Sequence, residues 1–534
     1  RLRRLGLYAS LPTSADATDQ QAKARLGRFM GLASKASAAT AWLVPELLAA
    51  GRETLADYET EDPRLASYRR YFDRLEAQRE HVRSSEIELL LGSLADAFGG
   101  AGRARGSLVS SDISYEPVVR SDGSTRAVAP STIDGLLGDP DREVRRQAFC
   151  NYADAFLSFR NTLTDLYATR VKQAVFSTGA RNYESTVEEA LAPREVPRAA
   201  LDSVVRVFQR RLPVWHRYWS VRRRLLGVTE LEPWDVFAPL SRSPLHIPYS
   251  QSVEWITESV APLGEEYASR LERGLKEERW VDVYPNRGKR EGAFAAHAPG
   301  SQPFIMMSYD NGTGGLSTLA HELGHAMHAQ LTMAEQPVVY GGYSMVVAET
   351  ASNLNQALLF PYLLDGNSDP EFQIAIIEEA LYNLHRYFFI MPTLARFELA
   401  VHGAAERGEG LTADRLNQIS ADLFSEGYGS ELAVDERTAI TWAQFQHLYV
   451  PFYTFQYACG ISAAAALGAD LRNGVAGARE RVLGFLASGD HLDPIETLRR
   501  AGVDLTTDDP IEKAFDSVEY YINRLEELAD QRAA

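Results

Sequence analysis

The sequence predicts a mainly α-helical protein. Hydrophobic residues repeat with helical spacing over long windows, for example in residues 201–212 and 511–531. Two stretches, 113–131 and 292–309, have the β-prone runs and turn residues that are typical of strands. The chain has 534 residues, of which 45% are hydrophobic, so it can bury a large core.

The elements follow in order along the chain. Residues 1–105 are expected to form amphipathic helices that end at the Gly-rich stretch 98–107, which is a domain boundary or a flexible bend. This divides the chain into an N-terminal helical region, 1–105, and a larger domain, 106–534. In the first β-prone stretch, Ser121-Asp122-Gly123 predicts a hairpin turn, and helices then resume. In the second, residues 292–309, we expect two strands.

Composition and charge exclude several classes of function. The formal net charge of -17, without a Lys/Arg-rich run, argues against nucleic acid as a partner. Only two cysteines occur, so a reducing compartment is expected and the cytoplasm is the simplest location. No apolar stretch of the kind that a secretory signal needs follows the basic N-terminus. The sequence does not indicate an oligomeric state.

One segment, Thr438 to Ala469, contains no Asp, Glu, Lys or Arg. It does contain Pro451, His447, three glutamines and several hydroxyl groups, and such polar groups are energetically costly inside a lipid bilayer. We therefore interpret it as buried protein and expect no membrane partner.

The motif HELGHAMH occupies positions 321–328 and follows a Gly-rich turn, 310–318. We expect its helix to begin near Ser317 or Thr318 and to reach about residue 331. A phosphate-binding loop is not indicated, because the Lys-Ser/Thr pair of such loops is absent.

Two histidines of the motif are candidate zinc ligands. His321 and His325 are four residues apart, which places them about 40° apart around a helix and roughly 6 Å apart along it. Glu322 lies on the adjoining edge, where it can act as a general base on water. The spacing matches H-E-x-x-H, and the alternative is a chance occurrence in a long chain.

His328 is expected to have another role. It lies about 10 Å along the helix from His321, so one ion with bonds of about 2 Å cannot take all three rings. We expect it to be structural or to support a ligand. The metzincin pattern is excluded, because the positions for its Gly and third His hold His328 and Leu331.

Glu349 is the expected third ligand. Between Asp310 and Asp365 the only charged residues are Glu322, Glu335 and Glu349. Glu335 is placed in an exposed loop, whereas Glu349 lies in an apolar helix near 344–360 that Ser344 caps. A buried carboxylate costs several kcal/mol unless it is paired or bound to metal. If Glu349 binds one Zn²⁺ ion together with His321 and His325, the ion compensates the cost of burying the carboxylate. The alternative is that Glu349 pairs with a distant Arg.

These residues resemble the thimet oligopeptidase family of HExxH zinc metallopeptidases, and within it most closely oligoendopeptidase F. The resemblance rests on STLAHELGHAMH, AETASN, HLYVPFYTFQYACG and RGKREGAF, and it extends over almost the whole chain. It implies a two-lobed, helix-rich zincin body around a deep substrate channel, with a small β-sheet beside the zinc helix. The resemblance also implies a short N-terminal beginning before Arg1, so we expect the chain to be trimmed.

The resemblance also assigns roles in the charge-free segment. It implies that His447, Tyr453 and Tyr457 donate hydrogen bonds to the carbonyl oxygen as that oxygen becomes an oxyanion. Tyr453 and Tyr457 are four apart, so they would share a helix face with Pro451 in the first turn, and core packing is the alternative for such a stripe. Thimet-type members carry a further tyrosine where Gly460 stands, so the division of labour between the two tyrosines stays open. Cys459 is expected to be a small buried residue.

The predicted function is therefore zinc-dependent cleavage of internal bonds in short unfolded oligopeptides. The strand from Phe304 to Tyr309 is expected to pair with the substrate backbone. The alternatives are a zinc carboxypeptidase or dipeptidase on the same scaffold, which would need a cation for the terminal carboxylate, and a non-catalytic peptide-binding protein. Sequence preference, cleavage position and the physiological peptide are not indicated.

Overall fold

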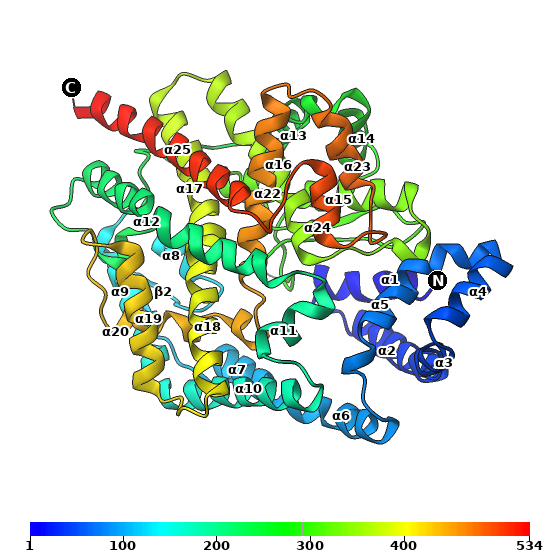
Figure 1. Cartoon of the computed structure of the whole chain (residues 1–534). Helices are drawn as coiled ribbons and strands as arrows, with labels where there is room; N and C mark the ends of the chain where they lie inside the picture. The colour runs from blue at the N-terminus through cyan, green and yellow to red at the C-terminus, as the bar shows by residue number, and fades with distance from the viewer. Residues whose placement is uncertain (291, 534) are drawn as a thin grey trace. The chain divides into compact units, whose positions relative to one another are not determined.

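A computed structural model of the chain describes residues 1–290 and 292–533. These residues form a mainly α-helical protein with two small β-sheets, as the sequence predicts (Figure 1). Glu291 and Ala534, which the predictions above include, lie outside the described residues.

The contacts of the chain define two compact units, each built from separate stretches of sequence. Unit 1 comprises residues 1–80, 244–367 and 462–504, and unit 2 comprises the remainder. The units therefore part at residue 80, and the expected division into 1–105 and 106–534 stays a prediction. The Gly-rich stretch 98–107, expected to be a boundary or a flexible bend, is mostly helical: one helix ends at Phe98, and residues 100–107 form the next.

Unit 1 contains the predicted metal motif. Its helices are α1 (Leu2–Ala15), α2 (Gln20–Thr40), α3 (Leu43–Ala50), α4 (Arg52–Glu61), η1 (Pro63–Tyr68), α5 (Arg69–Ala77), α13 (Tyr249–Ser259), η6 (Ala261–Leu263), α14 (Glu265–Lys276), α15 (Thr313–Glu335), η7 (Val338–Tyr340), α16 (Met345–Gly366), α23 (Ala478–Leu486) and α24 (Pro494–Ala501). Two further helices, η2 (Arg79–His81) and α22 (Phe455–Arg472), span the division between the units.

Unit 2 is also helical. Its helices are α6 (Ser85–Phe98), α7 (Gly100–Ser107), η3 (Leu108–Asp112), α8 (Ile133–Leu137), α9 (Arg142–Ser158), α10 (Arg160–Ala180), α11 (Thr186–Leu191), η4 (Ala192–Arg194), α12 (Arg198–Leu226), η5 (Pro233–Asp235), α17 (Pro370–His385), η8 (Arg386–Ile390), α18 (Met391–Glu406), α19 (Ala413–Tyr428), α20 (Glu436–Ala439), α21 (Thr441–Gln444), η9 (Gln446–Tyr449) and α25 (Asp509–Ala533). The segments η3 and η8 are π-helical, and the other η segments are 3₁₀-helical.

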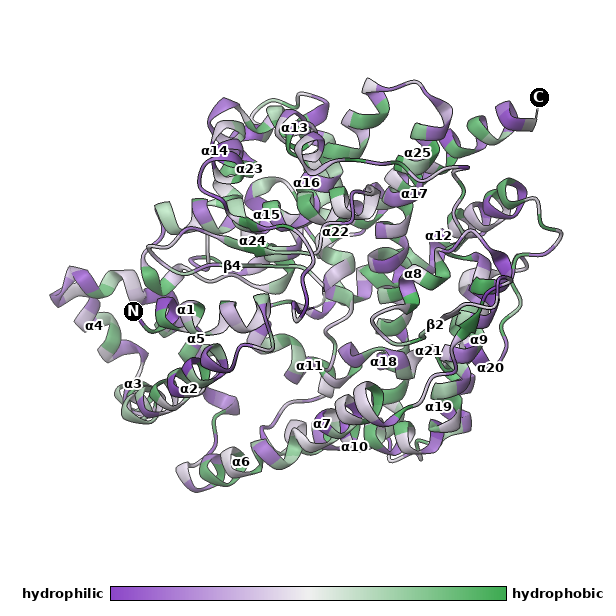
Figure 2. Cartoon of the chain, turned by 180° about the vertical axis from the view of Figure 1, so that it is seen from behind, coloured by the Kyte–Doolittle hydropathy of each residue, from purple (hydrophilic) through white to green (hydrophobic). Residues whose placement is uncertain are grey.

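The long helices of unit 2 are amphipathic. Helices α12 and α25 pack against each other, and both carry hydrophobic and hydrophilic residues along their length (Figure 2). On α12, Trp215 and Trp219 are completely buried and contact Phe389. The periodicity predicted for residues 201–212 and 511–531 is confirmed by these two helices.

The sheet of unit 1 has three strands in the order β3-β5-β4. The predicted strands in 292–309 are confirmed as β4 (Phe294–Ala296) and β5 (Phe304–Met306), which are antiparallel. A third strand, β3 (Val281–Asp282), pairs with β5 in parallel. Strand β5 is therefore central and bonded on both sides, so the prediction that it pairs with a substrate backbone is wrong: the edge strands are β3 and β4.

The sheet of unit 2 is the predicted hairpin. Strands β1 (Val118–Val119) and β2 (Thr125–Arg126) are antiparallel. In the turn, the Ser124 N–H donates to Asp122 Oδ1 over 2.9 Å, and Gly123 has φ of +81°. A residue with a side chain rarely adopts this φ, which explains the glycine.

The charge-free segment lies mostly in buried elements, as predicted: Trp442, Leu448, Phe455 and Cys459 are all at most 2% exposed. Burial also raises the pKa of Cys459 to about 12. Of the helices in the described part of the chain, none combines the length and the hydropathy that a membrane span requires.

Candidate metal centre

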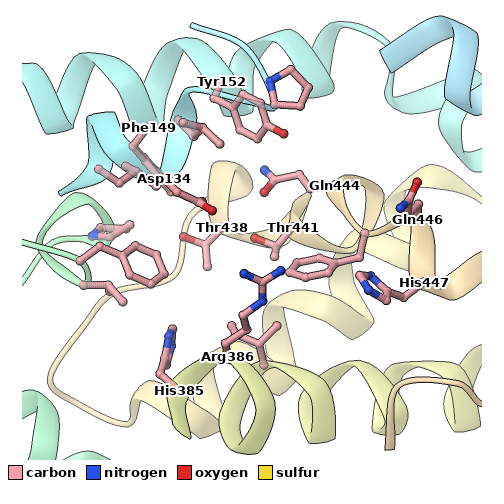
Figure 3. Close-up of a pocket in the computed structure, with 18 of the residues that line it drawn as sticks. Asp134, Phe149, Tyr152, His385, Arg386, Thr438, Thr441, Gln444, Gln446 and His447 are labelled. Atoms are coloured by element: carbon pink, nitrogen blue, oxygen red, sulfur yellow. The ribbon is translucent and has the colours of Figure 1, made fainter. Parts of the chain in front are cut away.

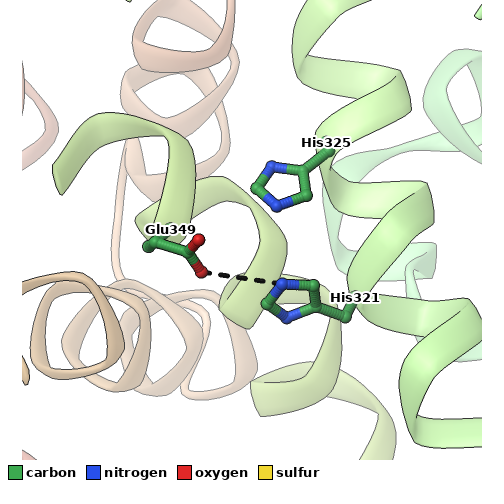
Figure 4. Close-up of side chains that lie close together, drawn as sticks. All are labelled: His321, His325 and Glu349. Atoms are coloured by element: carbon green, nitrogen blue, oxygen red, sulfur yellow. Dashed lines mark ion pairs between the residues drawn. The ribbon is translucent and has the colours of Figure 1, made fainter. Parts of the chain in front are cut away.

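The structure brings His321, His325 and Glu349 together in unit 1 (Figure 4). Each contributes one ligand atom, and these atoms all lie within 4.8 Å of one another. His321 Nε2 is 3.6 Å from Glu349 Oε2, and the two imidazole rings are 5.0 Å apart at 86°. We call these three residues the metal cluster.

Helix α15 supplies the two histidines and is longer than predicted. It begins at Thr313 rather than near Ser317 or Thr318, and it ends at Glu335 rather than near 331. The early start is explained by Asp310, whose Oδ1 accepts the backbone N–H groups of Gly312 and Gly315. Glu335 is exposed, as predicted, but it ends the helix instead of lying in a loop.

Helix α16 supplies Glu349. Ser344 caps it, as predicted, by accepting the Val347 N–H, and the helix runs to Gly366, beyond the expected end near 360. Glu349 is 6% exposed, so its predicted burial is confirmed. The Ser352 hydroxyl donates to Glu349 Oε2 over 3.2 Å, which helps to fix the carboxylate on its helix.

Helices α15 and α16 approach closely beside the metal cluster. A Cβ on Gly324 would lie 2.4 Å from the Ala351 carbonyl oxygen and 2.7 Å from Ser352 Cα. The missing side chain at Gly324, between Glu322 and His325, therefore sets the separation of the two helices. Asn355 joins them as well, because its Nδ2 donates to the Ala320 carbonyl over 3.2 Å.

His321 is oriented by a hydrogen-bonded pair of side chains. Its Nδ1 is 3.0 Å from Gln356 Oε1, and Gln356 Nε2 donates to Ser317 Oγ over 2.9 Å. Because the amide nitrogen of Gln356 donates to Ser317, its amide oxygen faces the ring and accepts a hydrogen bond from the Nδ1–H of His321. This tautomer leaves the lone pair of Nε2 directed to the metal cluster.

Glu322 lies next to the metal cluster without belonging to it. It is 6% exposed, and the Ala295 N–H of β4 donates to its carboxylate. Its Oε2 is buried and has no hydrogen-bond partner among the described residues. Burial raises the pKa of Glu322; nearby His321 lowers it in part, and Glu349 raises it further.

Burial lowers the pKa of the other two histidines of the motif, His325 and His328. Burial, with a smaller contribution from His321, lowers the pKa of His325 well below its ordinary value. His328 is completely buried and stacks on Tyr343 at 3.8 Å between ring centroids. It is not part of the metal cluster, in agreement with the prediction that it is structural or supporting.

The donor set of the metal cluster fits a metal ion. Two imidazoles and a carboxylate converge, and no Arg or Lys of the described residues forms an ion pair with Glu349. Tetrahedral ligands at bonds of about 2 Å lie about 3.4 Å from one another, close to the 3.6 Å between His321 and Glu349. His321 and Glu349 would therefore need little movement to hold a metal ion, and the ligand atom of His325 lies within 4.8 Å of both.

The remaining predicted residues, His447, Tyr453 and Tyr457, form a ring cluster in unit 2. The His447 ring is 6.1 Å from Tyr453 and 5.9 Å from Tyr457, and the two tyrosine rings are 5.5 Å apart. Burial, followed by Arg386 and Arg105, lowers the pKa of His447 to about 4, so the ring is neutral at pH 7. The approach of this cluster to a metal-bound peptide stays a prediction.

The prediction that Tyr453 and Tyr457 share a helix face is wrong. Helix α22 begins at Phe455, so Tyr453 and Pro451 precede it. The cause is Phe452, whose φ of +50° is left-handed and interrupts any helix at that point. The two tyrosine rings still meet, with 5.5 Å between their centroids.

Glu398, on α18, holds this turn. It is completely buried, and it accepts the Phe452 N–H over 2.7 Å and the Thr454 hydroxyl over 2.8 Å. These two donors flank Tyr453 on both sides in the sequence. Burial raises the pKa of Glu398 to about 8, against the opposing effects of the two hydrogen bonds and Arg194.

Sequence reasoning missed Gln356 and Glu398. Gln356 follows Glu349 by seven residues, two helical turns, so it shares the face of the third ligand, and this spacing was a usable signal. Glu398 lies between apolar residues of α18, Phe397 and Leu399, where a carboxylate also indicates a role. The residue that Glu398 contacts was not visible in the sequence, because 54 positions separate it from Phe452.

Comparison with known families identifies two matching segments. Residues 136–517 match the model of peptidase family M3, and residues 46–115 match the model of oligopeptidase F. The first match alone covers more than half of the chain and includes the metal cluster and the ring cluster.

Relatives and solved structures agree with this assignment. Oligopeptidase PepF of Bacillus subtilis is 33% identical over 99% of this chain and 79% of its own length. Group B oligopeptidase PepB of Streptococcus agalactiae is 30% identical over 99% of this chain and 88% of its own.

Two solved structures superpose well. A protein of Chlamydophila abortus described as a peptidase has a TM-score of 0.90 at 30% identity, over 99% of this chain and 88% of its own. Oligoendopeptidase-F from Enterococcus faecium has a TM-score of 0.79 at 29% identity, over 99% of this chain and 91% of its own. The family model, the relatives and the fold agree, and the chain belongs to peptidase family M3.

Proposed function

We propose that the protein is a zinc-dependent endopeptidase that hydrolyses internal peptide bonds of short unfolded oligopeptides. The observation that carries the proposal is the arrangement around α15. Two imidazoles and a carboxylate converge, and a buried glutamate oxygen without a partner lies beside them. The relatives named above are oligopeptidases, which supports short peptides as the substrate class.

Zinc is the ion that this donor set fits best. His321, His325 and Glu349 would hold it, which leaves a fourth position for water or substrate. When bound there, zinc supplies a Lewis acid that lowers the pKa of water and polarises a peptide carbonyl. Gln356 would keep the Nε2 lone pair of His321 in place for the ion.

Glu322 would move the proton in this reaction. Its Oε2 would take a proton from the attacking water and then give that proton to the leaving amine. The hydrogen bond from the Ala295 N–H holds the carboxylate and leaves Oε2 without a protein partner. A carboxylate that is held in place through one oxygen, while its other oxygen has no protein partner, is suited to act as the general base.

The substrate backbone would add to strand β4. Ile305 of β5 bonds toward β3, because its N–H donates to the Trp280 carbonyl. Its partner Ala295 therefore faces the outer edge of the sheet, where its N–H meets Glu322. Because this N–H is bonded to Glu322, an extended peptide at this edge would donate to the Ala295 carbonyl, which would place its backbone beside the general base.

The ring cluster would stabilise the oxyanion. The hydroxyls of Tyr453 and Tyr457 and the neutral His447 ring are hydrogen-bond donors, which lower the energy of a tetrahedral intermediate when they meet its oxygen. Loss of one such donor typically costs about 10²- to 10³-fold in kcat. The division of this role between the two tyrosines stays open.

The Glu322→Gln variant tests the proposal. The substrate is a quenched-fluorescent oligopeptide with both ends blocked, the products are analysed by mass spectrometry, and zinc content is measured on the same samples. The variant should bind one zinc and lose at least about 10²-fold in kcat, whereas Glu335→Gln, an exposed change on the same helix, should be unaffected.

Two results would overturn the proposal. Full activity of the Glu322→Gln variant would remove the assigned base. Failure of the wild-type, zinc-loaded protein to cut end-blocked peptides internally would favour the carboxypeptidase alternative.

A further inference from the structure

Unit 2 contains a cavity of about 710 Å³ (Figure 3). Its wall is formed by residues from α7, η3, α8, α9, η5, α17, η8, α19, α20 and the α21–η9 region. This volume is in the range of sites that enclose small molecules or a few peptide residues. Apolar and aromatic side chains such as Phe149, Tyr152 and Tyr382 form part of the wall.

Arg386 is the prominent cation of this cavity. Figure 3 shows its side chain pointing inward, toward Thr438 and Thr441. The side chain remains accessible, and it forms no ion pair or hydrogen bond with any described residue; its guanidinium contacts the Tyr387 ring at 5.8 Å. Burial lowers the pKa of Arg386, but charge interactions with Tyr387, Tyr382 and Asp134 raise it by more. The guanidinium therefore stays charged.

The local backbone directs Arg386 inward. It is the first residue of the π-helical turn η8, which connects α17 to α18. The other π-helical segment of the described chain, η3, contributes Val109 and Ser110 to the same wall. Single π-helical turns are rare, and they occur frequently at functional sites because they redirect side chains.

The charges of the wall favour an anion. Arg105 is also a cation without a carboxylate partner among the described residues, and its Nη2 donates to the Ala443 and Gln444 carbonyls. Asp134 is the one acidic residue of the wall, so the wall carries two positive charges and one negative charge. Burial lowers the pKa of His385 to about 3, and that of His447 to about 4, so neither ring adds charge at pH 7.

Uncharged polar groups complete the lining. The side chains of Thr441 and Gln444 face the cavity and form no hydrogen bond with the described residues. Together with Arg386 they provide a guanidinium fork, a hydroxyl and an amide for one ligand. A planar fork matches the two oxygens of a carboxylate.

The cavity adjoins the ring cluster through His447. This residue lines the cavity, and its ring also lies about 6 Å from both Tyr453 and Tyr457. One peptide residue spans at most about 3.5 Å of extended chain. A peptide whose carbonyl oxygen meets the ring cluster could therefore place a residue a few positions away inside the cavity.

We propose that the unit 2 cavity is a specificity subsite for a carboxylate of the oligopeptide substrate, and that Arg386 binds this carboxylate. The carboxylate is either the free C-terminus or the side chain of an Asp or Glu residue. This inference rests on the proposed function, and it adds an anionic preference that the metal cluster does not supply.

Four quenched peptides with the same central sequence test the inference and separate the two sources. The first peptide has a free C-terminal carboxylate, and the second has a C-terminal amide. The third and fourth also end in an amide; the third carries Glu at one position and the fourth carries Gln there. This position is then moved along the peptide. Wild-type kcat/KM should be at least about 10-fold higher for a carboxylate peptide than for its neutral partner, as expected for one charge-assisted bidentate contact. A preference in the first pair identifies the C-terminus, and one in the second pair identifies a side chain.

Variants then assign the preference to Arg386. Arg386→Met should reduce the carboxylate-to-neutral ratio to about one, Arg386→Lys should keep part of it, and Arg160→Met, an exposed change in the same unit, should leave it unaltered. Calorimetric binding of the same peptides to the Glu322→Gln protein should show the same ratios in Kd.

Equal wild-type rates for both members of each pair at every scanned position would overturn the inference, and so would an Arg386→Met variant that keeps the wild-type ratio. Absence of cleavage of all four peptides would instead refute the proposed function, so the two failures can be told apart.

Discussion

The close approach at Gly324 makes the substitution Gly324→Ala a sharp test of how the metal cluster is built. A Cβ at this position would lie 2.4 Å from the Ala351 carbonyl oxygen and 2.7 Å from Ser352 Cα, both of which are backbone atoms. Rotation of a side chain cannot relieve this contact. Helix α16, which carries Glu349, must therefore move away from α15.

The size of the effect follows from these distances. Ordinary contact begins near 3.4 Å, so the helices would separate by about 1 Å. Metal–ligand distances tolerate about 0.2 Å, and Glu349 would be displaced well beyond that. Alanine favours the helix by about 1 kcal/mol, but overpacking costs about 1–3 kcal/mol. We expect zinc affinity to fall by at least about 10-fold, as for other disturbed ligand shells, with a net stability loss of at most about 2 kcal/mol.

Zinc affinity is measured by competition with a chromophoric chelator, and stability by urea unfolding of the metal-free protein. The matched control is Gly31→Ala in α2 of the same unit, where a Cβ would meet no atom within 4 Å. This control should keep zinc affinity and gain about 0.5–1 kcal/mol of helix stability. Wild-type zinc affinity and activity in Gly324→Ala would refute the reasoning, because the helix spacing would then not set the position of Glu349.

Three further predictions concern the metal, its support and the turn at Tyr453. A zinc chelator should abolish peptide cleavage and added zinc should restore it, which a fluorescence assay follows directly. Gln356→Leu removes the acceptor of His321 Nδ1 and should weaken zinc binding about 10- to 100-fold in the chelator competition, whereas Gln356→Glu, which keeps an acceptor, should lose less. Glu398 has a pKa of about 8 in the folded protein against 4.5 unfolded, so the stability that it contributes is complete below about pH 4.5 and declines by about 1.4 kcal/mol per pH unit until about pH 8. Glu398→Gln mimics the protonated acid and should lack this decline, so thermal unfolding from pH 5 to 8 should show the wild type losing stability relative to the variant; parallel curves would contradict the assignment.

The sequence alone was sufficient to predict site residues that are close together in the chain. It was also sufficient for a residue whose burial costs free energy unless it has a partner. His321 and His325 are four apart on one helix, so helical geometry places them together without knowledge of the fold. Glu349 was recognisable because a lone carboxylate in an apolar helix needs a partner. The hairpin at Asp122 and the strands β4 and β5 followed from turn residues and β-prone runs.

Features that depend on contacts distant in sequence could not be predicted. Strand β3 contains only two residues, and its pairing with β5 makes β5 central, so that β3 and β4 are the edges. The left-handed turn at Phe452 depends on Glu398, on another helix, so a pattern of spaced tyrosines suggested a helix that is absent there. The compact units also combine separate stretches of chain, which no linear boundary signal reveals. The substrate channel and the cytoplasmic location stay predictions.

Anomalous diffraction at the zinc absorption edge, on crystals of the zinc-loaded wild-type protein, tests the central claim most directly. We predict a single strong peak among the His321 ring, the His325 ring and the Glu349 carboxylate, about 2.0–2.2 Å from one atom of each. A peak elsewhere, or none in crystals whose zinc content equals one ion per chain, would contradict the assignment of the metal cluster and the peptidase mechanism built on it.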